Sequence, residues 1–404
     1  MNCKLTTFIS TFGLLALNAC APNDAQSPPT SNGDSLEVII SHLDTLKVKE
    51  EVFNPNNWDR ASKIISGIPV EHEFQIDSLY YMKYKEFIST EFSTIKKKRL
   101  EKLKKWKANE VDTNDSNELR NVFYPFSGGD FIHLHQLYPK APHSLMLAIE
   151  PVGTLPDFSE LSVFDIDSTL HESQVMLRDI FFRSYFITKN MESDIEKSKH
   201  IGGILPSILW GVSSSGHDII SVDDVNVAKD GSMSFSPVDL GASFGQGVRV
   251  SFVKHGTENI QDVTYLSCDI SNKGLAKDTA MMSLLNNLGE VNSFVKAASY
   301  LMHYSSFSEI RNVLLDHSVI LIQDDTGIPF KNFHNKNRSI RLYGTYVEPV
   351  KDFNERLFQA DLVKAYQDTS YYIGKLPFSM GYHWGSKDQN QMIVHIKVLH
   401  GSKI

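Results

Sequence analysis

The amino-acid sequence predicts an α/β fold, in which a Rossmann-like layered sheet follows an N-terminal helical segment. After residue 120, short apolar runs typical of buried strands alternate with longer amphipathic patterns typical of helices. A glycine turn follows the first apolar run, and an acidic residue closes the second. Interleaved strands and helices pack as layers, with the helices against the faces of a mainly parallel sheet.

The first twenty residues are typical of a secretory signal. Lys4 precedes an apolar run that is too short to span a bilayer as a stable helix. The run ends in Leu17-Asn18-Ala19-Cys20, which resembles the lipobox of bacterial lipoproteins. The resemblance implies that residues 1–19 are removed as a signal peptide. Cys20, carrying acyl chains such as palmitate, would then become the mature N-terminus and anchor the protein in a lipid bilayer.

Residues 20–35 form a predicted tether. They include three prolines and no large apolar side chain, a composition typical of a solvated, semi-extended spacer. Several acyl chains on Cys20 would hold the membrane more firmly than a single chain. Ala21, in place of an aspartate, implies by resemblance an outer-membrane lipoprotein of a Gram-negative bacterium. We therefore expect a cell-envelope protein that faces the periplasm or the cell surface.

Charge and cysteine content exclude several classes of function. The formal net charge of −8 gives no reason to expect nucleic acid as a partner. Of the three cysteines, Cys3 would leave with the signal and Cys20 would be acylated, so only Cys268 remains. One cysteine can form neither an intramolecular disulfide nor a paired-cysteine zinc site. Cys268 follows an apolar run, and we expect it to be an inert core thiol.

Residues 36–118 are predicted to form a helical N-terminal region. Apolar residues from Leu36 to Leu46 recur at helical spacing, as do those from Phe74 to Trp106. The second half of the longer pattern is dense in lysine between Lys96 and Lys107. Such a helix can lie on anionic lipid, or it can dock on the domain by its aromatic stripe with the lysines facing water. We favour the second interpretation.

Residues 119–404 are predicted to form the α/β domain. Strands are expected at 121–126, 144–149, 205–212, 218–222, 248–253, 262–266, 319–322, 339–345 and 392–398. Helices are expected at 131–138, 160–198, 275–288, 291–303, 307–315 and 354–366.

The candidate ligand site begins with Ser127, Gly128, Gly129 and Asp130, a tight turn after the first predicted strand. Glu150 closes the second strand, 22 residues after Gly128. In Rossmann-type half-sites, glycines let a ligand approach the backbone and the acid accepts hydrogen bonds from ribose hydroxyls. The sequence therefore predicts a site for a small polar ligand, and a methyltransferase-like layout is the closest enzyme analogy.

Asp324 and Asp325 follow another buried strand, and we include them in the candidate site. Polar residues after parallel strands meet at the carboxyl edge of the sheet, although Asp-Asp-Thr-Gly is also a good turn sequence. His133 and His135 are placed on a helix, where neighbouring positions diverge, so no metal site is expected.

Most of residues 120–385 resembles a family of bacterial lipoproteins and secreted proteins that has no known activity. The segments that carry the resemblance are Phe123–Phe131, Ile149–Gly153, Ala298–Met302, Gln323–Phe330, Leu342–Tyr346 and Leu376–Phe378. The resemblance implies an envelope protein and supplies no catalytic residues. Two functions remain. The first is a membrane-anchored binding or assembly factor, whose partner is an envelope protein or a small polar ligand. The second is a transferase- or hydrolase-like envelope enzyme built on the same pocket. We favour the first, because nucleotide cofactors are not normally supplied outside the cytoplasm.

Overall fold

A computed structural model of the chain describes residues 56–70, 79–111, 115–183, 185, 188–333, 337–349, 357–385 and 390–398. All of these residues belong to one compact unit, Pro55–Ile404. The predicted signal, the tether with Cys20 and the predicted helix of residues 36–46 lie outside the described residues. Within the described part, no helix is both long enough and apolar enough to cross a bilayer.

The described residues form one mixed sheet of eleven strands, in the order β10-β9-β11-β8-β7-β1-β2-β6-β5-β3-β4. This confirms the α/β class. The strands are β1 (Val122–Pro125), β2 (His143–Ala148), β3 (His217–Val227), β4 (Met233–Pro237), β5 (Gly247–Lys254), β6 (Ile260–Ser267), β7 (Val291–Val295), β8 (Ser318–Gln323), β9 (Arg338–Gly344), β10 (Tyr372–Gly374) and β11 (Gln391–Lys397).

Five adjacent strands at the centre of the sheet, β8-β7-β1-β2-β6, are parallel. In the sheet, β2 and then β6 lie on one side of β1. The later strands β7 and β8 lie on its other side. On the flanks, β11 is antiparallel to β8 and β9, and β5 is antiparallel to β6 and β3. The carboxyl ends of the five parallel strands therefore meet at one edge, and the winding reverses between β1 and β7.

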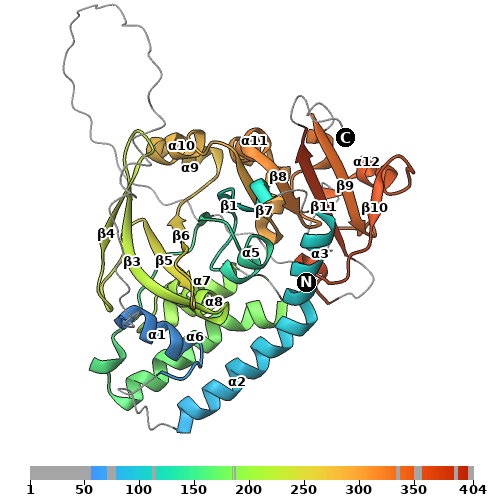
Figure 1. Ribbon diagram of the computed structural model, residues 1–404. Helices are drawn as coiled ribbons and strands as arrows, with labels where there is room; N and C mark the ends of the chain where they lie inside the picture. Colours follow the sequence, from blue (N-terminus) through green and yellow to red (C-terminus); the bar gives the residue numbers. More distant parts are fainter. Residues whose placement is uncertain are drawn as a thin grey trace, which may run out of the picture. The chain divides into compact units, whose positions relative to one another are not determined.

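Helices cover both faces of the sheet (Figure 1). Alternate residues of one strand enter different cores: Phe123 packs with one apolar cluster, whereas Val122 and Tyr124 pack with the other. Central strands buried on both faces are typical of parallel sheets. The helices of the first core are α1 (Asn57–Ile65), α2 (Leu79–Ile95), α3 (Glu101–Glu110), α5 (Phe131–Leu137), α6 (Val163–Arg183) and α8 (Leu205–Ser214); those of the second are α9 (Asn272–Lys277), α10 (Thr279–Asn286) and α11 (Ser308–His317).

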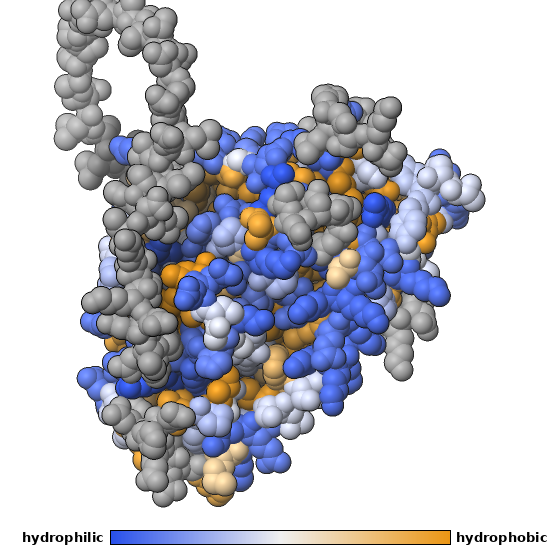
Figure 2. Space-filling model, viewed as in Figure 1, coloured by the Kyte–Doolittle hydropathy of each residue, from blue (hydrophilic) through white to orange (hydrophobic). Residues whose placement is uncertain are grey.

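The lysine-rich segment docks by its apolar stripe, as the favoured interpretation predicts. A π-helical turn, η1 (Lys96–Leu100), joins α2 to α3. Ile95, Leu103 and Trp106 are buried in the first core. Figure 2 shows a hydrophilic ridge over η1 and α3, where the exposed lysines lie: Lys96, Lys97, Lys98, Lys102, Lys104 and Lys105.

Two predicted elements are wrong. Residues 205–212 form not a strand but α8, in which every residue from Leu205 to Ser213 is buried. Periodicity cannot separate helix from strand in a run that is apolar on all sides, and Pro206, in the first turn of α8, favours a helix start. Residues 291–303 form not one helix but β7 followed by the 3-10 helix η3 (Ala297–His303).

Several predicted helices are shorter in the structure. Residues 160–198 contain α6 and α7 (Thr188–Lys197), and residues 275–288 contain the end of α9 and all of α10. Asp278 separates α9 from α10 because its side chain accepts a hydrogen bond from Met281 N at 3.0 Å and so caps the second helix. Late in the chain, the helix is limited to α12 (Ala360–Ala365) among the described residues. The short outer strands β4 and β10 were not predicted.

We expect Gly153→Ala to lower the free energy of unfolding more than Gly202→Ala does. Both glycines have positive φ, 79° and 58° respectively, which costs about 1–2 kcal/mol for alanine. A Cβ at Gly153 would also lie 2.4 Å from Gly203 N, whereas a Cβ at Gly202 meets open space. Urea denaturation of the two variants measures the difference. Equal losses would show that the loop after β2 does not pack closely against the loop before α8.

Candidate active site at the carboxyl edge of the sheet

A cavity of about 460 Å³ lies at the carboxyl ends of four neighbouring parallel strands, β1, β2, β6 and β7. It spans the position between β1 and β7 at which the winding reverses. Segments far apart in the sequence contribute its lining: Tyr124, Phe126, Ser127, Gly128, Ala148, Ile149, Glu150, Tyr185, Asp269, Ile270, Lys296, Ala297, Ala298, Leu301 and Phe307.

Three of the predicted site residues, Ser127, Gly128 and Glu150, line this cavity. Gly129 lies beside it and serves packing, because a Cβ there would lie 1.8 Å from Ser207 Oγ of α8. Asp130 is buried beside the cavity, where Tyr124 donates a hydrogen bond to its Oδ2 at 3.0 Å. The turn after β1 therefore lies at the predicted place, and of its four residues only Ser127 and Gly128 line the cavity.

Unusual backbone conformations occur in the cavity wall. Among the described residues, Phe126 and Ala297 are the non-glycine residues with positive φ, at 62° and 55°. Both line the cavity, and Gly128 beside Phe126 has a φ of 53°. Positive φ is sterically unfavourable for a side chain with a Cβ, most of all for a bulky one. Hydrogen bonds from the neighbouring Ser127 N to Leu147 O, at 3.0 Å, and from Ala297 N to Asp324 Oδ2, at 2.8 Å, hold the two segments.

The backbone after β2 is fixed by the strand beside it. Cys268 N donates to Ala148 O at 2.8 Å, and the buried hydroxyl of Tyr265 donates to Glu150 O at 2.7 Å. These bonds place the Glu150 side chain, which is 5% exposed, in the wall of the cavity. Burial raises the pKa of the half-buried Cys268 thiol to about 12, so the thiol is protonated at neutral pH.

A buried polar cluster lies under the cavity and centres on Asp130. Lys296 Nζ lies 2.5 Å from Asp130 Oδ2, and His133 Nδ1 lies 2.6 Å from Asp130 Oδ1. Lys296 Nζ is also 3.4 Å from His133 Nδ1. Lys296 and Tyr124 both reach the cavity, so they connect it to this cluster.

The ionisation of the cluster follows from burial and from its own charges. Burial alone would raise the pKa of Asp130, but His133 and Lys296 outweigh it and hold this pKa below its usual value. Burial lowers the pKa of His133 to about 4, against the opposing effect of Asp130. Burial likewise lowers the pKa of Lys296, although Asp130 favours its charged form. At neutral pH the cluster therefore contains an aspartate, a neutral imidazole and a lysine paired with the aspartate.

Arg99 adds a second cation behind the cluster. It belongs to the π-helical turn η1 and is 8% exposed. Its Nε donates to Ser379 O at 3.1 Å, while its Nη1 is buried without a hydrogen-bond partner. Burial lowers the pKa of Arg99 to about 10, so the guanidinium remains charged at neutral pH. π-Helical turns are frequent at functional sites, where they redirect a side chain.

Asp324 and Asp325 follow β8 at the same edge, but neither lines the cavity. Asp324 Oδ1 accepts hydrogen bonds from Thr326 N at 2.9 Å and from Thr326 Oγ1 at 2.6 Å. Asp325 is hydrogen-bonded to His383 Nδ1. Burial and the charge of Asp325 raise the pKa of Asp324 to about 7 despite these bonds. Asp324 therefore lies outside the cavity and holds the backbone of Ala297 by accepting a hydrogen bond from its N.

Asp269, Lys296 and Ala297 line the cavity and were not predicted. Asp269 comes two residues after β6, so the rule that identified Glu150 at the end of a strand could have found it. Lys296 and Ala297 could not be found in this way, because the sequence pattern predicts a helix over residues 291–303 and no strand that ends at Val295.

His133 and His135 lie on α5, as predicted, and diverge. His133 contacts Asp130, whereas the ring of His135 stacks on Phe131 and packs edge-on against His217. The two imidazoles therefore belong to different environments, one a polar cluster and the other an aromatic core.

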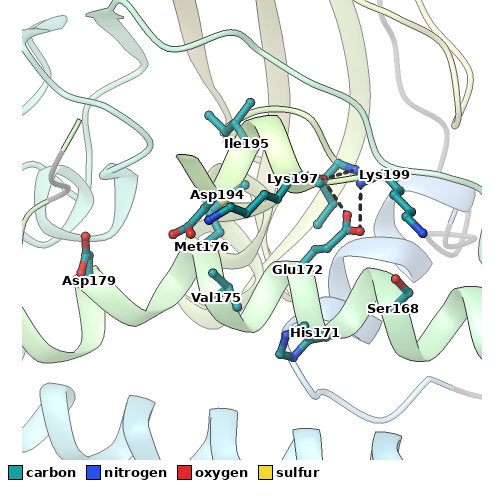
Figure 3. A pocket seen from close by; sticks show the side chains of 12 residues that line it. Ser168, His171, Glu172, Val175, Met176, Asp179, Asp194, Ile195, Lys197 and Lys199 are labelled. Atoms are coloured by element: carbon teal, nitrogen blue, oxygen red, sulfur yellow. Dashed lines mark hydrogen bonds between the residues drawn. The ribbon is translucent and has the colours of Figure 1, made fainter. Parts of the chain in front are cut away.

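A second cavity, of about 300 Å³, lies between α6 and α7 (Figure 3). Its central carboxylate, Glu172, accepts hydrogen bonds from Ser198 Oγ at 2.6 Å, Lys199 N at 3.0 Å and His200 N at 3.1 Å. His171 forms a hydrogen bond of 3.2 Å with the hydroxyl of Tyr80. The polar groups of this cavity thus serve to fix the end of α7 and to join α6 to α2.

In comparisons with protein-family models, with curated proteins and with solved structures, nothing matches this chain. The geometry of the site is therefore the basis for its interpretation.

We expect stability to fall more steeply with rising pH in the wild-type protein than in an Asp324→Asn variant. The pKa of Asp324 is about 7 in the folded state and 3.8 for an unperturbed aspartic acid, so the folded protein binds this proton more tightly. The contribution is present in full below about pH 4 and is lost as the pH rises through about 7.

Urea denaturation at intervals between pH 4 and pH 8 measures this effect. The pKa of His383 is also raised, by its hydrogen bond to Asp325, so the difference between wild type and variant is the relevant quantity. The exposed Asp239→Asn is the matched control and should follow the wild-type curve. Parallel curves for wild type and Asp324→Asn would contradict the raised pKa.

Proposed function

We propose that this protein is a lipid-anchored binding protein of the bacterial envelope, whose Rossmann-like domain binds a nucleoside-type ligand at the sheet edge. In chain order, the five parallel strands are β1, β2, β6, β7 and β8, and in the sheet they have the order 3-2-1-4-5. This is the order of doubly wound dinucleotide-binding sheets, which bind ligands where the winding reverses. The cavity lies at that position.

The proposal rests on one observation: the two non-glycine residues with positive φ among the described residues both line this cavity. Residues held at unfavourable φ cluster at ligand-binding and catalytic sites, because function retains a conformation that stability alone does not favour. Phe126 precedes the turn after β1, and Ala297 follows the end of β7. Phe126 therefore lies on the β1 side of the position where the winding of the sheet reverses, and Ala297 lies on the β7 side.

The chemistry of the wall favours a ribose. Glu150 and Asp269 follow the second and third parallel strands, and both line the cavity. A carboxylate accepts hydrogen bonds from the two neighbouring hydroxyls of a ribose, as the acid of dinucleotide-binding folds does. Gly128 lets a ligand approach the backbone, and Ile149, 55% exposed, and Ile270 offer apolar contact for a base.

A transferase-like envelope enzyme is the second candidate, and the position of β11 favours it. When β9 and β11 are counted as the sixth and seventh strands, the sheet order continues as 3-2-1-4-5-7-6 with β11 antiparallel. This is the layout of methyltransferase-like sheets, to which the glycine turn and distant acid also correspond. Turnover of the bound ligand would distinguish this enzyme from a binding protein.

Adenosine should bind the full-length protein in detergent micelles, and Glu150→Gln should weaken it about tenfold or more. Loss of a charged hydrogen-bond acceptor costs about 1.5–3 kcal/mol, and 1.4 kcal/mol corresponds to a factor of ten. Isothermal titration calorimetry measures both affinities, with Glu101→Gln on the exposed face of α3 as the matched control. No binding of adenosine to a folded wild-type protein, or equal binding by Glu150→Gln, would contradict the proposed site.

The envelope anchor has its own test. In a Gram-negative host, the wild-type protein should fractionate with membranes and incorporate labelled palmitate, because Cys20 would be acylated. Cys20→Ser should abolish the label, whereas Cys268→Ser should retain it. An unlabelled wild-type protein would contradict the anchor and leave the proposed nucleoside site unaffected.

A further inference from the structure

We infer that the lysine ridge on η1 and α3 binds the anionic headgroups of a phospholipid bilayer, so that this face of the domain lies against the membrane. The ridge consists of six exposed lysines, Lys96, Lys97, Lys98, Lys102, Lys104 and Lys105 (Figure 2). It is separate from the nucleoside cavity, none of whose lining residues belongs to η1 or α3. The choice of lipid as the partner rests on the proposed envelope location, whereas the test below does not depend on acylation.

The π-helical turn η1 exposes three consecutive lysines. Arg99 and Leu100 of this turn are both buried, so two adjacent side chains enter the domain. The three lysines before them, Lys96–Lys98, all remain exposed. The last of these is followed by Lys102 and Lys105 at i+4 and i+7, the spacing of residues on one face of a helix. The ridge is therefore a continuous cationic face rather than a scatter of single charges.

The positive charge of the ridge is not matched by the protein. Between residues 96 and 107 the sequence has eight cations and one acid, Glu101, in a chain whose formal net charge is −8. Within the described part of the chain, none of the six ridge lysines forms an ion pair. The ridge therefore differs in sign from the chain as a whole.

The acids at the carboxyl end of α3 have other partners. Glu118 forms ion pairs with Lys107 and Lys140, and neither of these lysines belongs to the ridge. Glu110, the last residue of α3, accepts a hydrogen bond from the hydroxyl of Tyr372 at 2.8 Å. These carboxylates consequently leave the ridge uncompensated.

Folding stability does not account for this arrangement. Opposite charges at i and i+4 of a helix stabilise it, whereas like charges at that spacing destabilise it by similar amounts. Asp59 and Lys63 of α1 form such a favourable pair at 2.7 Å. Lys98 and Lys102 have the unfavourable combination at the same spacing. An anionic surface against the ridge would relieve this repulsion.

The ridge suits the headgroup layer of a bilayer rather than its hydrocarbon interior. Among the described residues, none of the large apolar side chains that are exposed belongs to η1 or α3. The ridge can therefore contact lipid only through charge. Each lysine close to an anionic membrane surface contributes about fivefold in affinity.

The predicted anchor would bring the domain close to lipid without selecting a face. Cys20 precedes Asn56, the first described residue, by 36 residues, which span at most about 120–130 Å. A domain of about 350 residues has a radius of gyration of about 20 Å. Any face could therefore reach the bilayer, and we expect the charge of the ridge to decide which face does.

Vesicle co-sedimentation tests the ridge. The protein is the full-length chain carrying Cys20→Ser, so that no acyl chain contributes. It should bind vesicles of phosphatidylglycerol and phosphatidylcholine in equal parts at least tenfold more tightly than vesicles of phosphatidylcholine alone. This preference should disappear as salt is raised from about 0.1 M to about 1 M, because the Debye length falls from about 10 Å to about 3 Å.

A triple variant removes half of the ridge. In the same Cys20→Ser background, Lys98→Gln, Lys102→Gln and Lys105→Gln together should weaken binding to the anionic vesicles about 100-fold, at about fivefold for each charge. All three side chains are exposed, so the variant should keep the fold. Glu101→Gln, which removes the acid of the ridge, should instead strengthen binding about fivefold.

A matched control changes the net charge equally on other elements. Lys229→Gln, Lys273→Gln and Lys277→Gln together affect exposed lysines of the turn between β3 and β4 and of α9, a helix of the second core. The helix α3 belongs to the first core, on the other face of the sheet. This control should therefore keep the affinity of the parent chain for anionic vesicles.

The outcomes separate this inference from the proposed function. Equal binding to both kinds of vesicle, or equal losses in the ridge variant and the control, would overturn the ridge and leave the nucleoside site and the anchor intact. Tighter binding to duplex DNA than to anionic vesicles would overturn lipid as the partner. Absence of the palmitate label, together with ridge-dependent binding to anionic vesicles, would overturn the anchor and support the ridge.

Discussion

The carboxylate of Asp130 joins the turn after β1 to the end of β7, and the arrangement of the sheet edge depends on that connection. One of its oxygens faces Lys296 and the hydroxyl of Tyr124, and the other faces His133 of α5. Strand β7 pairs with β1 through few residues, because the paired register runs only from Val122 to Phe123 on the β1 side. The ion pair thus holds together two segments that the backbone hydrogen bonds align only at their start. Ionic and polar links of this kind tolerate poorly the loss of one partner, since the remaining charge is buried.

The parts of the fold that were predictable are those whose patterns are local. β1, α5 and β2 follow from an apolar run, a glycine turn and a second apolar run, and the acid that closes β2 identified Glu150. The same rule would have reached Asp269. Residues 205–212 could not be assigned in this way, because burial on every side removes the periodic signal. In residues 291–303, β7 is buried at all five positions and a 3-10 helix follows almost directly, so the apolar run does not show where the strand ends. Lys296 and Ala297 lie in the second of these segments, so they could not be predicted as residues of the site. Their importance comes from the pairing of β7 with β1, a contact between segments more than 150 residues apart, and no local pattern records it.

The proposed nucleoside site and the predicted lipid anchor make different demands on the chain. A nucleoside site at a sheet edge is typical of proteins inside the cell, where such ligands are made, whereas the lipobox-like segment implies export. Both are reconciled if the ligand is a nucleoside or nucleotide scavenged or sensed at the envelope, a role that needs binding and no cofactor supply. The strained residues Phe126 and Ala297 support retention of the site, because a wall that had lost its ligand would have no reason to keep them. Fold alone does not decide between binding and catalysis.

A crystal structure of the full-length protein soaked with adenosine would test the central claim most directly. The account predicts electron density for the ligand at the carboxyl ends of β1, β2, β6 and β7. The ribose should lie within hydrogen-bond distance of Glu150, beside the turn at Gly128. An empty cavity at saturating ligand, or density only between α6 and α7, would contradict it.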